Sequence, residues 1–131
     1  MAYRWVEHTA ELELAIDAGS EEAVFVEALA ALADLLGGAR GGELTAREVS
    51  VTARDRGALL VAWLDELVYL VESEDLVPEA VERLALADDR LTASVVARVG
   101  RPRHLVKAAT YNHLTFERSG GGYRATVVLD V

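Results

Sequence analysis

The chain has 131 residues and a mass of 14.1 kDa, about the size of one domain, and we predict a single domain over residues 1–131. Hydrophobic residues make up 52% of the sequence and aromatic residues 6%, which supplies an aliphatic core and excludes intrinsic disorder. The 22 acidic residues outnumber the 13 basic ones, giving a net charge of -9. This charge repels a phosphate backbone and argues against autonomous DNA or RNA binding.

Cysteine is absent from the sequence, which excludes disulfides, thiol nucleophiles and zinc sites built on thiolates. Any metal must therefore bind to oxygen or imidazole ligands. The first residues contain no apolar run of signal-peptide length, and no later stretch reaches the roughly 20 apolar residues that span a bilayer. We therefore expect a soluble cytoplasmic protein.

The first half of the chain predicts two strands, a helix and a third strand. Residues 3–7 are β-prone, and residues 11–17 alternate between polar and apolar side chains, the pattern of a half-buried strand. Ser20, followed by two glutamates, is the expected N-cap of a helix that ends at the glycines of 37–38. Valines in the stretch 49–51 predict the third strand.

Asp55 is the expected N-cap of a second helix, from about Arg56 to Ser73. Six of its apolar residues recur at helical spacing on one face, which should form the centre of the core. They are Leu60, Trp63, Leu64, Leu67, Leu70 and Val71.

Strand patterns dominate the rest of the chain. They cover residues 81–86, 91–99, about 105–117 and 123–131, with turns at 88–89 and 119–122. The order of elements lacks the strict strand–helix–strand alternation of a doubly wound sheet. We therefore predict an α+β fold in two layers, with two amphipathic helices packed on a mixed, mostly antiparallel sheet.

Familiar catalytic and phosphate-binding signatures, such as GxGxxG, the P-loop, GxSxG and HExxH, are absent from the sequence. The glycine clusters lack the strand-before, helix-after context of a phosphate cradle, and we interpret them as turns. A hydrolase that uses a side-chain nucleophile has little support.

Acidic residues near both ends of the chain are candidate metal ligands. Asp130 is penultimate, so its carboxylate lies within a few ångströms of the α-carboxylate of Val131. A hard cation such as Ca²⁺ or Mg²⁺ would neutralise this pair, and the alternative is a solvated chain end. Glu11 is a candidate third carboxylate, although it also fits the polar phase of an alternating strand. His8, Glu11 and His113 could instead form a transition-metal site.

A basic stretch, residues 98–107, contains four positive charges and no acids. Three of these residues are candidates for contact with RNA phosphates or with an acidic partner: Arg101, Arg103 and Lys107. The alternative is that these charges balance acidic neighbours within the fold.

Four motifs together resemble the archease family. They are HTAE at 8–11 after a short strand, WLDELVY at 63–69 on a helix, VKAATY at 106–111 and VLDV at 128–131. Their order and spacing match over essentially the whole chain. The resemblance implies an accessory protein without an active site of its own, which assists an RtcB-type tRNA-splicing ligase by promoting ligase guanylylation and multiple turnover.

The resemblance also implies a divalent metal, with calcium expected first and magnesium or manganese as alternatives, bound by Glu11, Asp130 and Val131. Two positions depart from the family pattern. Glu11 stands where the family usually has Asp, which adds a methylene and a rotor. His113 comes one residue later than the family's histidine, which in a regular strand would move the imidazole to the other face of the sheet.

Two other functions remain open from the sequence. One is a small metal-dependent phosphoesterase in which Glu11, Asp130 and a bound cation activate water. The other is a general chaperone of tRNA-modifying enzymes, in which the same surface would bind different partners.

Overall fold

The computed structural model describes residues 2–8, 11–39 and 41–131, and the side chains of Glu7 and His8 fall outside that description. Over these residues the chain forms two helices and seven strands in the order expected from the sequence. The elements are β1 (Ala2–His8), β2 (Glu11–Ala18), α1 (Glu21–Leu36), β3 (Leu44–Thr52), α2 (Arg56–Glu74), β4 (Leu76–Leu86), β5 (Arg90–Val99), β6 (Ala108–Ser119) and β7 (Gly122–Asp130). None of the described helices is long and apolar enough to cross a membrane.

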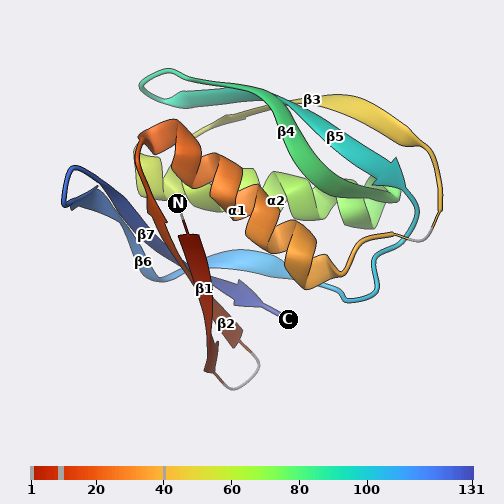
Figure 1. Cartoon of the computed structure of the whole chain (residues 1–131), viewed down its shortest axis with the longest axis horizontal. Coiled ribbons are helices and arrows are strands. Elements are labelled where there is room, and N and C mark those ends of the chain that lie inside the picture. Colours follow the sequence, from red (N-terminus) through yellow and green to blue (C-terminus); the bar gives the residue numbers. More distant parts are fainter. Residues whose placement is uncertain (1, 9–10, 40) are drawn as a thin grey trace.

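The strands form two antiparallel sheets, with strand orders β1-β2-β7-β6 and β3-β5-β4. Both helices lie between the two sheets (Figure 1), where α1 packs mainly on β4 and β2, and α2 mainly on β6. The predicted α+β class is confirmed. The expected single mixed sheet in two layers is corrected to three layers: sheet, helices, sheet.

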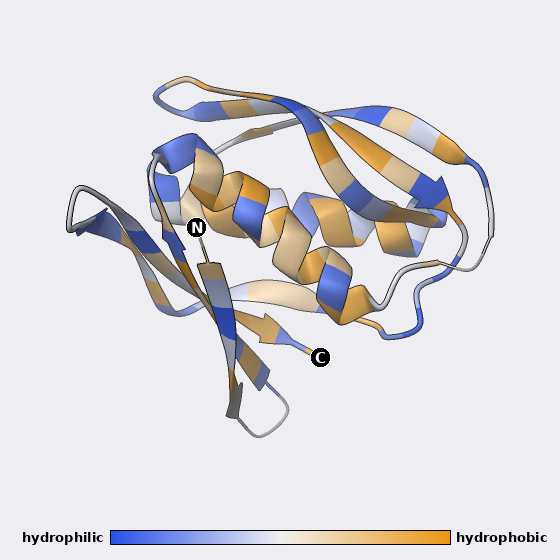
Figure 2. Ribbon diagram, viewed as in Figure 1, coloured by the Kyte–Doolittle hydropathy of each residue, from blue (hydrophilic) through white to orange (hydrophobic). Residues whose placement is uncertain are grey.

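The breadth of the apolar surface on α2 explains the third layer. The six residues expected on one face are all buried, but so are several apolar residues between them, including Leu59, Val61 and Val68. A helix that is apolar around so much of its circumference needs cover on more than one side. Figure 2 shows the hydrophobic residues gathered on the helices between the sheets.

Both helices begin where the sequence predicts. The Ser20 side chain accepts a hydrogen bond from the main-chain N–H of Ala23, and Asp55 accepts one from Ala58 at 2.8 Å. These oxygens satisfy N–H groups that the first turn of a helix leaves without an intrahelical partner. At the other end of α1, Gly37 adopts the left-handed conformation that closes a helix, with φ of 76°.

Two strands, β4 and β6, differ most from their predicted bounds. β4 begins before Pro78 and pairs with β5 through two register shifts, which suits a proline on an edge strand. β6 begins at Ala108, after a loop over residues 100–107. This loop is hydrogen-bonded to the end of α1: the main-chain N–H groups of Arg103 and His104 both donate to the carbonyl oxygen of Leu36.

Candidate functional site

Glu11 and Asp130 lie directly opposite each other on the neighbouring antiparallel strands β2 and β7. Directly opposed residues have Cβ atoms about 5 Å apart and share one face of the sheet. The next pair along, Leu12 and Leu129, belongs to the opposite face, and Leu129 is fully buried in the core. The two carboxylates therefore lie on the outer face, at the end of the sheet where β7 runs out beside β2 (Figure 1).

The structure thus places two of the three residues predicted to bind a metal, Glu11 and Asp130, opposite each other. Glu11 and Asp130 are partly buried, and Val131, which follows Asp130 directly, is 40% exposed. Across the described residues, no three His, Asp or Glu side chains gather closely enough to hold an ion. A cation at this end would therefore have two side-chain carboxylates and would need further oxygens from the terminus, the main chain or water.

His113 reaches the same outer face because β6 is not a regular strand. Its pairing with β7 breaks between Thr110 and Thr115, and His113 takes a left-handed backbone conformation with φ of 56°. This bulge brings the imidazole Nδ1 to 3.7 Å from a carboxylate oxygen of Glu13 on β2. Because β7 lies between β6 and β2 in the sheet, the side chain of His113 reaches across β7 to contact Glu13. Val128, the residue of β7 that pairs with Glu13, is only 1% exposed.

The displacement of His113 to the other face was expected only for a regular strand, and this condition is not met, because extra residues in one strand reset the alternation of side chains. Within the described side chains, His113 lies at ion-pair distance from Glu13, and the suggested transition-metal site of His8, Glu11 and His113 stays a prediction. His8 pairs with Glu11 through the β1–β2 backbone register. Its side chain lies outside the described residues, as do Thr9 and Ala10 of the HTAE motif.

Asp65 is a residue near this end to which the sequence assigned no role. Asp65 is exposed as a whole residue, but its carboxylate accepts a part-buried hydrogen bond of 2.8 Å from the main-chain N–H of Ala109 at the start of β6. Ala108, one residue earlier, is the register partner of Asp130. Burial raises the pKa of Asp65, and the hydrogen bond from Ala109 acts in the opposite direction. The sequence signal was an acid inside the apolar WLDELVY helix.

In the basic stretch, residues 98–107, some positive side chains form ion pairs with acidic side chains and others do not. Arg98 forms a 2.7 Å ion pair with Glu79 on β4, so this charge balances an acidic neighbour. Arg101 lies 3.6 Å from Asp75, with both side chains mostly exposed. In the parts of the chain that are described, Arg103 and Lys107 have no acidic side chain within ion-pair distance. The candidate partner contacts are therefore accessible.

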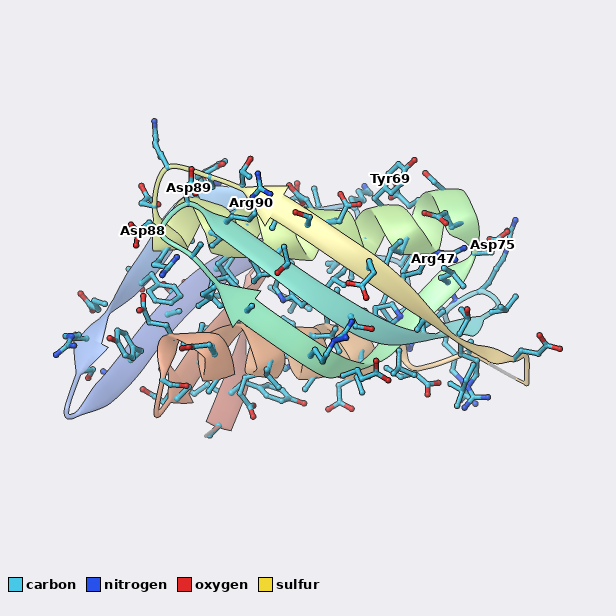
Figure 3. The ribbon with its side chains drawn as sticks, turned by 90° about the horizontal axis from the view of Figure 1, so that it is seen from above. Arg47, Tyr69, Asp75, Asp88, Asp89 and Arg90 are labelled. Carbon is cyan, nitrogen blue, oxygen red and sulfur yellow. The ribbon has the colours of Figure 1, made fainter. Side chains whose placement is uncertain are left out.

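The outer face of the three-stranded sheet has a different electrostatic character. Seen from above (Figure 3), its side chains carry both signs of charge, and Arg83 pairs with Glu48 at 2.6 Å. Ser94, buried at the centre of this face, donates to Glu82 at 3.1 Å. Charges there largely neutralise one another, in contrast to the acidic end of the four-stranded sheet.

Solved structures share this arrangement of two helices between two sheets. The solution structure of protein 1598 from Methanobacterium thermoautotrophicum matches with a TM-score of 0.74 and 26% identity, over 98% of each chain. A crystal structure from Thermotoga maritima, described as "an archease, possible chaperone", matches in fold with a TM-score of 0.71 and 23% identity, over 96% of this chain and 94% of that one. The fold is therefore that of an archease-like protein.

The sequence gives the same result. The model of the archease protein family matches residues 3–131. The chain is 34% identical to protein archease of Methanosarcina acetivorans, over 98% of this chain and 95% of the relative. It is 31% identical to protein archease of Archaeoglobus fulgidus over the full length of both. The chain belongs to the archease family.

Proposed function

We propose that this protein is a cytoplasmic accessory factor, rather than an enzyme, that assists an RtcB-type RNA ligase in tRNA splicing or RNA repair. It promotes guanylylation of the ligase and repeated turnover, and it acts with a bound divalent cation. The observation that carries the proposal is the pairing of Glu11 with Asp130 across β2 and β7 in a chain of the archease family.

The donor set supports a hard cation. Two carboxylates on one face, together with the main-chain oxygen of Val131, offer only oxygen ligands. Ca²⁺ accepts six to eight oxygens at about 2.3–2.6 Å in flexible geometry, whereas Mg²⁺ demands near-ideal octahedral coordination. The longer side chain of Glu11 suits the more tolerant ion, so calcium is our first choice, with magnesium and manganese as alternatives. Bound there, the ion would neutralise carboxylates that otherwise repel one another.

The charge distribution supports protein docking rather than direct RNA binding. A net charge of -9 disfavours contact with phosphates and favours approach to a basic protein surface. The loop over 100–107 adjoins the acidic end, because the main-chain N–H of Lys107 donates to the carbonyl oxygen of Asp130 at 2.8 Å. Arg101, Arg103 and Lys107 would contact acidic groups of the ligase or the RNA that the ligase holds.

The test is ligase guanylylation followed over many turnovers, with a cognate RtcB-type ligase, GTP and calcium, magnesium or manganese. We expect the parent protein to stimulate it and the double variant Glu11→Ala, Asp130→Ala to fail. Asp17→Ala is a matched control, because it removes an acid from the same strand, where Asp17 pairs with Arg124. Absence of stimulation by the parent would refute the proposal, and a phosphodiesterase activity lost in Asp130→Ala would replace it with the metal-dependent phosphoesterase.

A further inference from the structure

We propose that Asp65 is a positioning residue for the cation site: from α2 it holds the start of β6 against β7, next to Asp130. This inference rests on the proposed cation site and names a residue that supports it without touching the ion.

β6 is an edge strand, with β7 as its one neighbour in the sheet. The outward N–H groups of an edge strand have no strand partner and ordinarily face water. At Ala109 this N–H donates instead to the Asp65 carboxylate, 2.8 Å away. The hydrogen bond to a charged acceptor is of the stronger kind, and it fixes the start of β6 to the helix layer.

The pairing that Asp65 supports is short. Only three register pairs join β6 to β7 before the bulge, namely those of Ala108, Ala109 and Thr110 with Asp130, Leu129 and Val128. On one side of this segment is the loop over 100–107, and on the other is the break in pairing that continues to Thr115. So short a ladder has little stability of its own, and its middle residue, Ala109, is held by the hydrogen bond that it donates to Asp65.

Asp130 lies within this segment. Its carbonyl oxygen accepts the Lys107 N–H at 2.8 Å, and its register partner is Ala108. Lys107 and Ala108 are the two residues that come before Ala109 in the chain. Movement of β6 at Ala109 would therefore disturb the backbone that orients the Asp130 carboxylate toward Glu11. Groups that orient metal ligands commonly change affinity by about 10–100-fold when they are removed.

Two substitutions at one position separate positioning from charge. Asp65→Asn keeps an oxygen that can accept the Ala109 N–H but removes the negative charge, whereas Asp65→Ala removes the acceptor. We expect Asp65→Ala to weaken Ca²⁺ binding, measured by calorimetry with the metal alone, by roughly tenfold, and Asp65→Asn to bind within about twofold of the parent. Amide hydrogen exchange at Lys107 and Ala109 should be faster in Asp65→Ala even without calcium.

Arg56→Ala controls for general loss of stability. Arg56 is the first residue of α2, and it donates to Glu21 at 2.8 Å and to the carbonyl oxygen of Ala87 at 2.6 Å. Its removal should lower the melting temperature without changing calcium affinity, measured where all variants are folded.

Parent-like binding by Asp65→Ala would overturn the inference, as would an equal loss in Asp65→Asn, because the charge itself would then be the cause. An equal loss in Arg56→Ala would also overturn it, since the effect would then be one of stability. If the parent bound none of Ca²⁺, Mg²⁺ and Mn²⁺, the proposed cation site would be wrong and this role of Asp65 would fall with it.

Discussion

The indole Nε1 of Trp63 donates a hydrogen bond to the main-chain oxygen of Phe25, 3.0 Å away, and so joins α2 to α1 inside the core. Both side chains are fully buried. We predict that Trp63→Ala lowers the free energy of unfolding by about 3–5 kcal/mol through lost burial and a cavity. Urea denaturation checks this, with Tyr69→Ala as a control, because Tyr69 lies on the same helix but is 52% exposed. A Trp63 variant as stable as the parent would contradict the prediction.

A second prediction concerns Tyr3, whose hydroxyl donates a hydrogen bond to Asp34 on α1. This bond, with smaller contributions from burial and the negative charges of Asp34 and Glu27, raises the pKa of Tyr3 to about 12. A raised phenol pKa adds stability that is present below the unfolded pKa of about 10 and is lost as pH rises through the folded value. Ultraviolet titration should show a late tyrosine transition that belongs to Tyr3.

Tyr3→Phe should remove the late transition and leave the others in place. Asp34→Asn, which keeps a side-chain oxygen but not the charge, should move the transition toward the ordinary tyrosine value. A single shared midpoint in the parent would show that Tyr3 is not held by Asp34.

A third prediction follows from the burial that raises the pKa of Asp65. Because the folded state binds this proton more tightly than the unfolded state, the ionised carboxylate costs stability above the folded pKa, and the cost disappears as pH falls through it. Asp65→Asn should therefore unfold at a higher temperature than the parent at pH 7, and the gain should shrink under acid conditions. Glu22→Gln on exposed surface is the control. A gain that stayed constant with pH would exclude this cause.

The fourth prediction tests the chain end. If a terminal carboxylate of Val131 binds the ion, residues added after Val131 replace this anionic ligand with a neutral carbonyl, and calcium affinity should fall markedly. Asp130→Asn should act in the same direction, because it keeps an oxygen but removes its charge, while circular dichroism remains unchanged. The same residues added before Met1 are the matched control. Equal calcium binding by the two extended proteins would show that the terminal carboxylate is not a ligand.

The fifth prediction separates partner contact from metal binding. Arg101→Glu with Arg103→Glu should impair ligase activation and leave calcium affinity nearly unchanged, because exposed charges farther apart than about 8 Å are largely screened at physiological salt. The control is the double variant Arg54→Glu with Arg90→Glu. It reverses the same number of charges near the turn at 88–89, which lies at the opposite end of the three-stranded sheet from Asp75 (Figure 3). Unaltered activation by the first pair would assign the basic loop to charge balance alone.

Local features were predictable from the sequence because their causes are local. Ser20 and Asp55 begin helices with hydrogen bonds to residues three positions later, and the spacing around Trp63 identifies a buried face. The division of the strands into two sheets depends on pairings between distant segments, such as β3 with β5. No residue pattern within either strand specifies that choice.

The candidate site shows the same limit. The opposition of Glu11 and Asp130 agrees with what the family resemblance implied, whereas strand spacing alone left Glu11 as an ordinary polar residue. The bulge that brings His113 toward Glu13 contains no glycine or proline from which it could be predicted. Asp65 bonds a main-chain N–H of Ala109, and every non-proline residue has such a group, so the sequence gives no sign of which one it selects.

The pairing of β2 with β7 joins segments from opposite ends of the chain, and this has a consequence for synthesis. Glu11 is synthesised before its partner Asp130 on β7, and the elements from α1 to β6 are made between the two. Contacts between such distant segments close late in folding, because the intervening loop must be ordered first. A nascent chain that has not reached Asp130 therefore lacks the carboxylate pair, and an ion that binds the pair would stabilise only molecules in which β2 and β7 have been made and have paired.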